Sequence, residues 1–363
     1  MLAYPLGTPV SLPNMQLQRS RNLFGIRNVR IGFSFKKILL DLGMLGRLPS
    51  LLQTGRYDVV HVLEEMALPV IFLCRRKQLP VIYDMQSSLP DQLRTNAFCR
   101  LGAVQFVLRK VEDWMLRRAT AVICSAGLLH HVKARAPHAL AYEWKFAGQP
   151  RDETHRPVAL REHLGFASDA RIIMYCGTFE SYQGIDMFLA AIPRVLNVIP
   201  NAVALLVGAT PDDDLMADPS ASELVRQRKL HILPRQPRHT IPSYLAMADV
   251  LVSPRSYGDN VPLKIFDYLL SGKPIVATDI LAHRSILNDQ IAKLVACSPS
   301  AIAEGINHLL LHQDEAARIA KAALEHANAA PGKQSFIDLV EQLYVSTLSD
   351  DTQARLGRPL GLE

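Results

Sequence analysis

Short apolar strands alternate with amphipathic helices twice along the 363-residue chain, and this alternation constrains the fold more than any other feature. The first round contains three buried strands, at residues 57–63, 80–85 and 120–125. The second round begins with the strand at 171–176 and continues to residue 297. Strands that alternate with helices pair in parallel, and helices then cover both faces of the sheet. We therefore predict an α/β protein with two doubly wound, Rossmann-like halves.

The polar, proline-containing stretch at residues 145–156 predicts the connector between the halves. We expect a first domain at 1–150, incomplete at its start, and a second domain at 151–334. An amphipathic pattern predicts a final helix at 335–349, and the patternless residues 350–363 predict a flexible tail. Two α/β halves in one chain commonly bind their ligand in the cleft between them.

The composition is that of an ordinary globular protein, with 49% apolar and 20% charged residues. No run of about 18 apolar residues predicts a membrane-spanning helix. The five cysteines are scattered and odd in number, which argues against a zinc site or a disulfide framework. They favour a reducing compartment, and we expect a cytoplasmic protein, with the inner face of the membrane as one location. The cysteines are Cys74, Cys99, Cys124, Cys176 and Cys297.

Charge is distributed unevenly between the two halves. Residues 1–150 hold 20 Lys or Arg against 9 Asp or Glu, a net charge of +11, whereas residues 151–363 hold 20 against 25, a net charge of −5. A basic first half fits an anionic acceptor or peripheral contact with an anionic membrane. The predicted helix at 35–54, with its basic entry, is either a core-facing helix or an edge that lies on such a membrane. No recognisable nucleic-acid-binding motif is present, so we expect no nucleic-acid partner.

Residues 257–278 (YGDNVPLKIFDYLLSGKPIVAT) predict a loop, a short helix and the next strand. Pro262 suits the first turn of a helix, where its missing N–H has no partner. Lys264 and Asp267 are three residues apart and share a helix face, and Asp259 lies in the loop before the helix. The end of a parallel strand beside a helix N-terminus favours a phosphate, and carboxylates there suit sugar hydroxyls.

These residues resemble a known family. Asp259 and Asp267 are separated by seven residues, and together with LKIFDY and SGKPIVAT they resemble the E-x7-E region of retaining glycosyltransferases of the GT4 family. The resemblance implies the GT-B fold, in which two Rossmann-like domains face a cleft. It also implies that the first acid lies beside the donor sugar and that the second binds the nucleotide ribose. Both acids are aspartates here, whereas the family has glutamates.

The loop that follows the strand at 171–176 is the second part of the expected donor site. Gly177 lets the backbone approach a ligand closely. The family commonly has an Arg or Lys near each end of this loop to bind the donor diphosphate. The matching residues here are Thr178 and Gln183, and neither is charged. Three basic residues supply the missing charge in this interpretation: Lys264, Arg235 and Arg255.

The resemblance assigns the remaining site residues. Asp259 and Lys264 are the expected catalytic residues, together with Gln86, which stands where the family often has a histidine. Gln86 cannot act as a base, but a donor phosphate oxygen can take the acceptor's proton in the front-face mechanism proposed for retaining enzymes. The resemblance implies no metal and no cofactor other than the nucleotide-diphosphate sugar, which is the donor substrate. The backbone at Asn260, Val261 and Leu263 is expected to border the donor.

We therefore expect a retaining glycosyltransferase of the hexosyltransferase type that moves a sugar to a lipid-linked, glycan or small-molecule acceptor. The uncharged Thr178, Gln183 and Gln86 favour an alternative, a catalytically weak or inactive nucleotide-sugar-binding or scaffold protein. A sugar-nucleotide epimerase with the same fold is a further alternative. Donor hydrolysis or transfer by the purified protein distinguishes the three.

The first residues differ from the family's pattern. The family's N-terminal domain opens with a strand, a glycine-containing loop and a helix, before a second strand that residues 2–7 resemble. The first strand of a doubly wound sheet is central, and its loss leaves backbone groups unpaired. We therefore expect the native start to lie upstream of Met1 and the 363-residue form to be poorly active.

Overall fold

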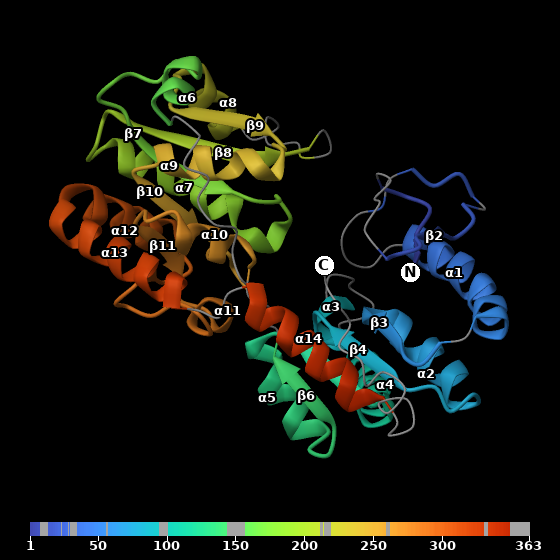
Figure 1. Cartoon of the computed structure of the whole chain (residues 1–363). Helices are drawn as coiled ribbons and strands as arrows, with labels where there is room; N and C mark the ends of the chain where they lie inside the picture. The colour runs from blue at the N-terminus through green and yellow to red at the C-terminus, as the bar shows by residue number, and fades with distance from the viewer. Residues whose placement is uncertain are drawn as a thin grey trace. The chain divides into compact units, whose positions relative to one another are not determined.

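The computed structural model divides into two compact units, Met1–Trp144 with Ile337–Glu363 and Lys145–Phe336 (Figure 1). The structure describes residues 1–7, 14–22, 24–27, 29, 35–55, 57–93, 101–143, 157–210, 213, 219–258, 262–329 and 333–348.

The first unit is built on a four-stranded parallel sheet in the order β3-β4-β5-β6. Every residue of β4 and β5 is buried, because helices cover both faces of these central strands. The strands are β3 (Val60–Leu63), β4 (Val81–Met85), β5 (Ala121–Cys124) and β6 (Leu140–Glu143). The helices of this unit, apart from the last, are α1 (Phe35–Thr54), the 3-10 turn η1 (Glu64–Met66), α2 (Ala67–Arg75), α3 (Leu89–Leu93), α4 (Gly102–Arg118) and α5 (Ala126–Arg135).

Two further strands near the N-terminus, β1 (Leu2–Ala3) and β2 (Gln18–Arg19), form a separate parallel pair. Helix α1 follows them over the predicted residues, but its side chains face differently from the sequence prediction. The spacing predicts one core face made of Ile38, Leu42, Leu45, Leu48 and Leu52. Leu48 and Leu52 are buried as predicted, whereas Ile38 and Leu42 are exposed. The prediction was wrong for Ile38 and Leu42 because the first half of α1 packs on the β1 and β2 segments, where Tyr4 donates a hydrogen bond to Asp41.

The last helix, α14 (Lys333–Thr347), covers the back face of the first unit's sheet. Leu343 is fully buried against Ile82, Ala121 and Ile123. The opposite face carries the larger core, to which α1, α2, α4 and α5 contribute. Figure 1 shows α14 in red beside the blue and green strands, so the chain returns to its first unit after completing the second.

The second unit has a six-stranded parallel sheet in the order β12-β11-β10-β7-β8-β9. Its first strand, β7, is central, and the chain adds β8 and β9 on one side before it adds β10, β11 and β12 on the other. This is the doubly wound arrangement, so the predicted fold class is confirmed. The strands are β7 (Arg171–Cys176), β8 (Ala202–Ala209), β9 (Leu230–Pro234), β10 (Val250–Ser253), β11 (Ile275–Thr278) and β12 (Lys293–Val295).

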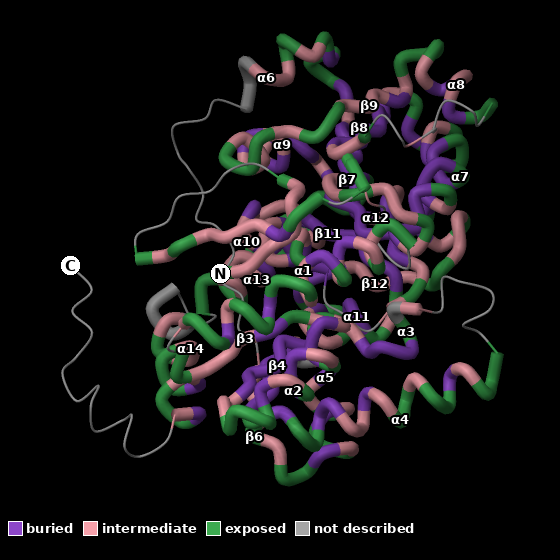
Figure 2. Tube along the Cα trace, turned by 90° about the vertical axis from the view of Figure 1, so that its right-hand side faces the viewer, coloured by how far each residue is buried: buried purple, intermediate pink, exposed green. Residues whose placement is uncertain are grey.

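Helices cover both faces of this sheet, and the strands between them are largely buried, as the purple segments in Figure 2 show. One core lies under α7, α8 and α12, and the other lies under α6, α9, α10 and α13. The helices are α6 (Pro157–His163), α7 (Ile185–Leu196), α8 (Pro219–Arg226), α9 (Ile241–Met247), α10 (Lys264–Leu270), α11 (Leu281–Arg284), α12 (Pro299–Leu311) and α13 (Gln313–Ala329), with 3-10 turns η3 (Ser181–Gln183) and η5 (Arg238–Thr240). Among the described residues, no helix is both long and apolar enough to cross a membrane.

Candidate active site

The strand order reverses between β7 and β10, and ligands of open α/β sheets bind outside the carboxyl ends of strands at such a point. The loop after β7 leads through η3 into α7, and the loop after β10 leads into α10. The two loops are in contact, because the Ser256 N–H donates to the carbonyl of Tyr182 at 2.9 Å. A Cβ on Gly184 would lie 2.0 Å from the Pro254 carbonyl oxygen, and its φ of +70° also favours glycine.

Lys264 joins these two loops. Its ammonium nitrogen donates to the Tyr175 hydroxyl at 2.7 Å and to the Gln183 side-chain oxygen at 2.9 Å. It also lies 3.9 Å from the centre of the Tyr175 ring, a cation–π contact. Burial is the main cause that lowers the pKa of the Lys264 ammonium group to about 7, and the nearby positive charge of Arg255 adds to the effect.

Gly177 leaves room for this lysine. A Cβ at Gly177 would lie 3.0 Å from the Lys264 ammonium nitrogen and 2.9 Å from the Tyr175 hydroxyl. The Tyr175 hydroxyl donates to the carbonyl of Thr178, and the buried Gln183 amide lies 3.4 Å from the Thr178 hydroxyl. The structure therefore brings four predicted site residues together: Gly177, Thr178, Gln183 and Lys264.

Tyr268 is a residue that sequence reasoning missed. Its buried hydroxyl accepts the Cys176 N–H at 2.8 Å and lies 3.4 Å from the Val252 carbonyl, so it spans the ends of β7 and β10. The spacing of Leu263, Phe266, Leu269 and Leu270 predicts that these residues face the core. Leu269 is buried as predicted, but Leu263 is exposed, and Ile265 and Tyr268 are buried as well. The sequence feature that could have indicated Tyr268 was its polar hydroxyl among the apolar residues of this helix.

Arg255 fixes the loop that follows β10. Its Nε donates to the Tyr257 carbonyl at 2.8 Å, and its guanidinium lies 5.0 Å from the centre of the Tyr182 ring. Arg255 is 9% exposed, so it adds fixed positive charge near the Lys264 site.

Asp267 lies on α10 but faces a different neighbourhood from Lys264. It lines a small pocket with Arg238, Ile241 and Leu245, at the start of α9. Arg238 is therefore a second site residue that the sequence analysis missed. The pair Arg235 and Arg238 after β9 was the sequence feature that could have indicated it. The predicted Arg235 is exposed at the end of β9, and its backbone N–H donates to Ala209.

Four other residues were predicted for the site: Asp259, Asn260, Val261 and Gln86. Asp259, Asn260 and Val261 lie outside the described residues. Gln86 belongs to the first unit, where its amide donates to Asp84 just after β4.

Gln86 is part of a polar cluster at the carboxyl ends of β3 and β4 in the first unit. Ser87 donates to both carboxylate oxygens of Glu64, at 3.2 and 3.3 Å. His61 lies 3.7 Å from the Asp84 carboxylate, and its other nitrogen lies 2.8 Å from the Tyr344 hydroxyl. Sequence reasoning missed Glu64, which follows an apolar strand directly.

Glu64 has two unusual properties. Its φ of +51° is rare for a residue with a side chain, and such strain clusters at functional sites. Burial, and then the neighbouring Glu65, raise the pKa of the Glu64 carboxyl to about 7. The carboxylates at this edge can accept hydrogen bonds from the hydroxyls of a hydroxyl-rich ligand. The Ser87 hydroxyl can donate a hydrogen bond to such a ligand or accept one from it.

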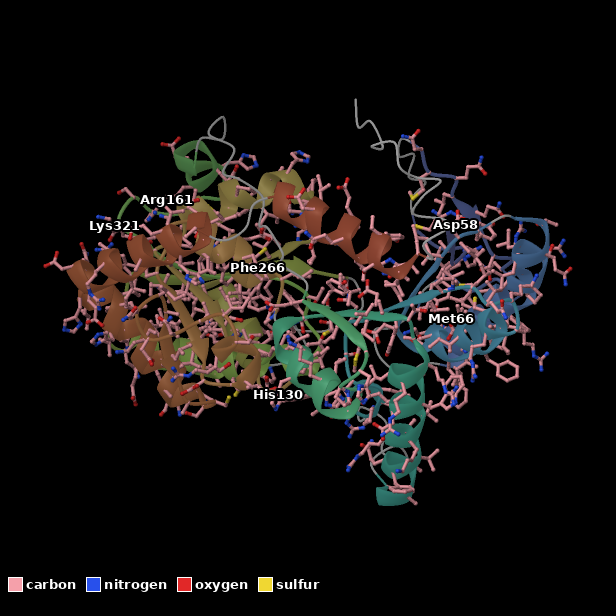
Figure 3. All side chains as sticks on the ribbon, turned by 60° about the horizontal axis from the view of Figure 1, so that its bottom comes forward. Asp58, Met66, His130, Arg161, Phe266 and Lys321 are labelled. Carbon is pink, nitrogen blue, oxygen red and sulfur yellow. The ribbon has the colours of Figure 1, made fainter. Side chains whose placement is uncertain are left out.

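No grouping of His, Cys, Asp and Glu among the described residues is suited to hold a metal ion. The adjacent pair His130 and His131 is not such a group: His131 lies 2.7 Å from the Glu112 carboxylate, whereas His130 is exposed (Figure 3).

Residues 159–326 match the family described as glycosyl transferases group 1. Residues 13–135 match the family described as glycosyl transferase 4-like domain. The two matches cover the loops after β7 and β10 in the second unit and most of the first unit. The chain is a GT4-type glycosyltransferase with the GT-B fold.

Among its relatives, this glycosyltransferase is similar to glycogen synthase of Mycobacterium tuberculosis, at 22% identity over 338 residues, which are 92% of the chain and 76% of that enzyme. It is also 27% identical over 245 residues to phosphatidyl-myo-inositol mannosyltransferase of Mycolicibacterium smegmatis, covering 65% of the chain and 57% of that relative.

Solved structures have the same fold. Sucrose-phosphate synthase from Thermosynechococcus elongatus superimposes with a TM-score of 0.73 at 17% identity, over 93% of this chain and 84% of that one. The Anabaena protein Alr3699/HepE, solved in complex with UDP-glucose, gives a TM-score of 0.66 at 17% identity, over 86% of this chain and 89% of its own.

Proposed function

We propose that this glycosyltransferase moves a sugar from a nucleotide-diphosphate sugar to a hydroxyl-bearing acceptor with retention of anomeric configuration. The observation that carries the proposal is the position of Lys264, whose ammonium group lies between the loops after β7 and β10. This is the switch point of the sheet, and the positive charge there suits a diphosphate. The likeness to a structure solved with UDP-glucose supports this choice of donor.

In this proposal Lys264 stabilises the departing diphosphate. Charge that develops on a leaving group is best stabilised by a cation fixed in a largely water-excluded site. The amino end of α7, which begins beside Gly184, adds backbone N–H groups and the positive end of its dipole. In the family, the matching loop commonly has a basic residue at the positions of Thr178 and Gln183. In this proposal the charge of Lys264 takes their place. No metal ion is required for this charge balance.

Asp267 and Arg238 are proposed to bind the nucleoside, because they line one pocket beside α9. A carboxylate accepts hydrogen bonds from two neighbouring ribose hydroxyls. Asp259 remains the proposed contact of the donor sugar, as the family resemblance implies.

The acceptor is proposed to bind the first unit at Glu64, Asp84 and Ser87. Hydroxyls of a lipid-linked, glycan or small-molecule acceptor suit these groups. Gln86 orients the Asp84 carboxylate rather than moving a proton. The acceptor's proton goes to a phosphate oxygen of the donor, on the face from which the diphosphate leaves.

A two-stage experiment tests the proposal. The purified full chain is first screened by thermal shift against nucleotide sugars, and a ligand at 100 times its Kd is expected to add about 2.7 kcal/mol of stability. The donor so found is then incubated with candidate acceptors, and NMR of the product reports the anomeric configuration. An inverted product would contradict retention, and epimerised donor would favour the epimerase. Binding without hydrolysis or transfer would favour the scaffold alternative.

A further inference from the structure

The outer sides of α2 and α4 in the first unit expose large apolar side chains. Phe72 on α2 is 51% exposed, and Phe106 and Val107 on α4 are 61% and 57% exposed. The two helices pack against each other and contribute to the same core on one face of the sheet. Their solvent-facing sides therefore form one surface, called here the α2/α4 face.

Basic groups lie directly beside these aromatic rings. The Arg76 guanidinium lies 4.9 Å from the centre of the Phe72 ring, and the Lys110 ammonium lies 5.5 Å from the centre of the Phe106 ring. Each pair presents an apolar ring with a cation at its side. Such side chains suit the boundary between lipid headgroups and acyl chains, where the ring enters the bilayer and the cation stays at the headgroups.

The acidic groups of α2 and α4 themselves do not offset this charge. Helix α2 contains no Asp or Glu. On α4, Glu112 is fully buried and accepts the Leu89 N–H, and Asp113 is paired with Arg135 at 2.7 Å. Arg75, Arg109 and Arg117 are also exposed on these helices. The α2/α4 face is therefore both apolar and positively charged.

We propose that the α2/α4 face binds the surface of an anionic lipid bilayer. A second copy of the chain is a poor occupant, because a symmetric contact would bring Arg76 and Lys110 towards the same charges of its partner. An anionic bilayer instead satisfies the apolar rings and the cations together. Figure 3 shows α4 as the teal helix that projects lowest in the view, with side chains around it.

This inference does not rest on the donor chemistry. It differs from the sequence-based expectation, in which the basic entry of α1 lies on the membrane. The α2/α4 face carries two ring–cation pairs, whereas near the start of α1 Lys37 is paired with Glu65 at 2.5 Å.

The test is co-sedimentation of the full chain with phosphatidylcholine vesicles, with and without phosphatidylglycerol. We expect binding only to the anionic vesicles, weakened by added salt because the charges are screened. The variant Phe72→Ser/Phe106→Ser should bind about tenfold more weakly, because it loses both inserted rings. The matched control Leu281→Ser/Leu311→Ser removes two exposed apolar residues of the second unit and should bind as the parent does.

A second readout distinguishes a bilayer from a protein partner. In Phe106→Trp, emission should shift to the blue with anionic vesicles and be quenched by brominated acyl chains, which report burial among lipids. Absence of binding, equal binding to neutral vesicles, or unchanged binding of the double serine variant would overturn the proposal. So would a concentration-dependent dimer that the double variant abolishes, because a second copy would then cover this face.

Discussion

The ammonium nitrogen of Lys264 lies 2.9 Å from the side-chain oxygen of Gln183, so the helix after β10 is tied to the loop after β7. The uncharged Gln183 of that loop therefore has the ammonium group of Lys264, from α10, beside it. In the proposed mechanism, the positive charge beside the diphosphate therefore comes from α10 and not from the loop positions where the family commonly carries it.

Replacing Lys264 with methionine should reduce activity without reducing stability. Methionine removes the cation that we propose stabilises the diphosphate, and kcat/KM for transfer should then fall at least about 100-fold, or about 2.7 kcal/mol. Unfolding by urea should be unchanged or need more denaturant, because a buried charge is costly. The control is Lys321→Met on the exposed side of α13. Full activity in Lys264→Met would remove this residue from the mechanism.

Donor affinity should fall as pH rises above about 7. Unliganded Lys264 loses its proton through a pKa of about 7, whereas the diphosphate binds the protonated form. Above pH ~7 each further unit weakens binding by up to about tenfold, and binding takes up a proton. Calorimetric titrations in two buffers with different ionisation enthalpies measure this uptake. An affinity that does not change between pH ~6 and ~8 would contradict the prediction.

Asp267→Ala should weaken nucleotide binding by about 1–3 kcal/mol, because the proposed ribose hydroxyls lose their acceptor. The control is Asp289→Ala, which removes an exposed carboxylate of the second unit that pairs with Arg284 at 2.8 Å. Titration calorimetry with the free nucleoside diphosphate makes the comparison. Equal dissociation constants for both variants and the parent would place the ribose elsewhere.

Glu64→Gly should stabilise the first unit and impair transfer. Glycine adopts a φ of +51° without strain, and the change removes a half-buried carboxyl whose pKa is raised to about 7. We expect about 1 kcal/mol more stability. Donor hydrolysis should persist while transfer to acceptor falls, because the carboxyl is assigned to the acceptor. Leu63→Gly, at the neighbouring exposed position, is the control. Parallel loss of hydrolysis and transfer would argue against that assignment.

His283 should make the second unit sensitive to mild acid. Burial lowers its pKa from 6.5 to about 4, and it is held by Ser253 at 2.9 Å and by the Thr278 carbonyl at 2.7 Å. Because the folded pKa is depressed, the unfolded chain binds the proton first. Stability is then lost as pH falls from about 6.5 towards 4, by up to about 3 kcal/mol. Urea unfolding of the parent and of His283→Asn, which does not titrate, should diverge in this range. Identical pH profiles would refute the prediction.

The alternation of strands and helices was enough to predict both parallel sheets, because strands covered on two faces are continuous apolar runs. Arg171–Cys176 was predicted to the residue. The partner of α14 was not predictable, since an amphipathic pattern shows that a helix has a buried side but not which sheet it covers. The same limit applies to α1. Its pattern did not show that the first half of the helix packs on the N-terminal segment, where Tyr4 donates to Asp41.

The candidate site was predicted as a set of positions rather than as contacts. Spacing places Lys264 and Asp267 on one face of α10, yet they have different neighbours. The long lysine side chain reaches Tyr175 and Gln183, whereas the short carboxylate stays beside Arg238. Tyr268 was missed because its polar function depends on the ends of two strands, which are distant in sequence.

The closure of the first sheet by α14 has a consequence for synthesis. His61 and Tyr344, which meet at 2.8 Å, are separated by 283 residues. At about 5–20 residues per second, a ribosome needs roughly 15–60 s to bridge that interval. During this time Ile82 and Ile123 have no Leu343 to cover them, and the nascent first unit presents an apolar sheet face to the cell. A chaperone that shields β-sheet surfaces should therefore engage the chain until its last helix has been made.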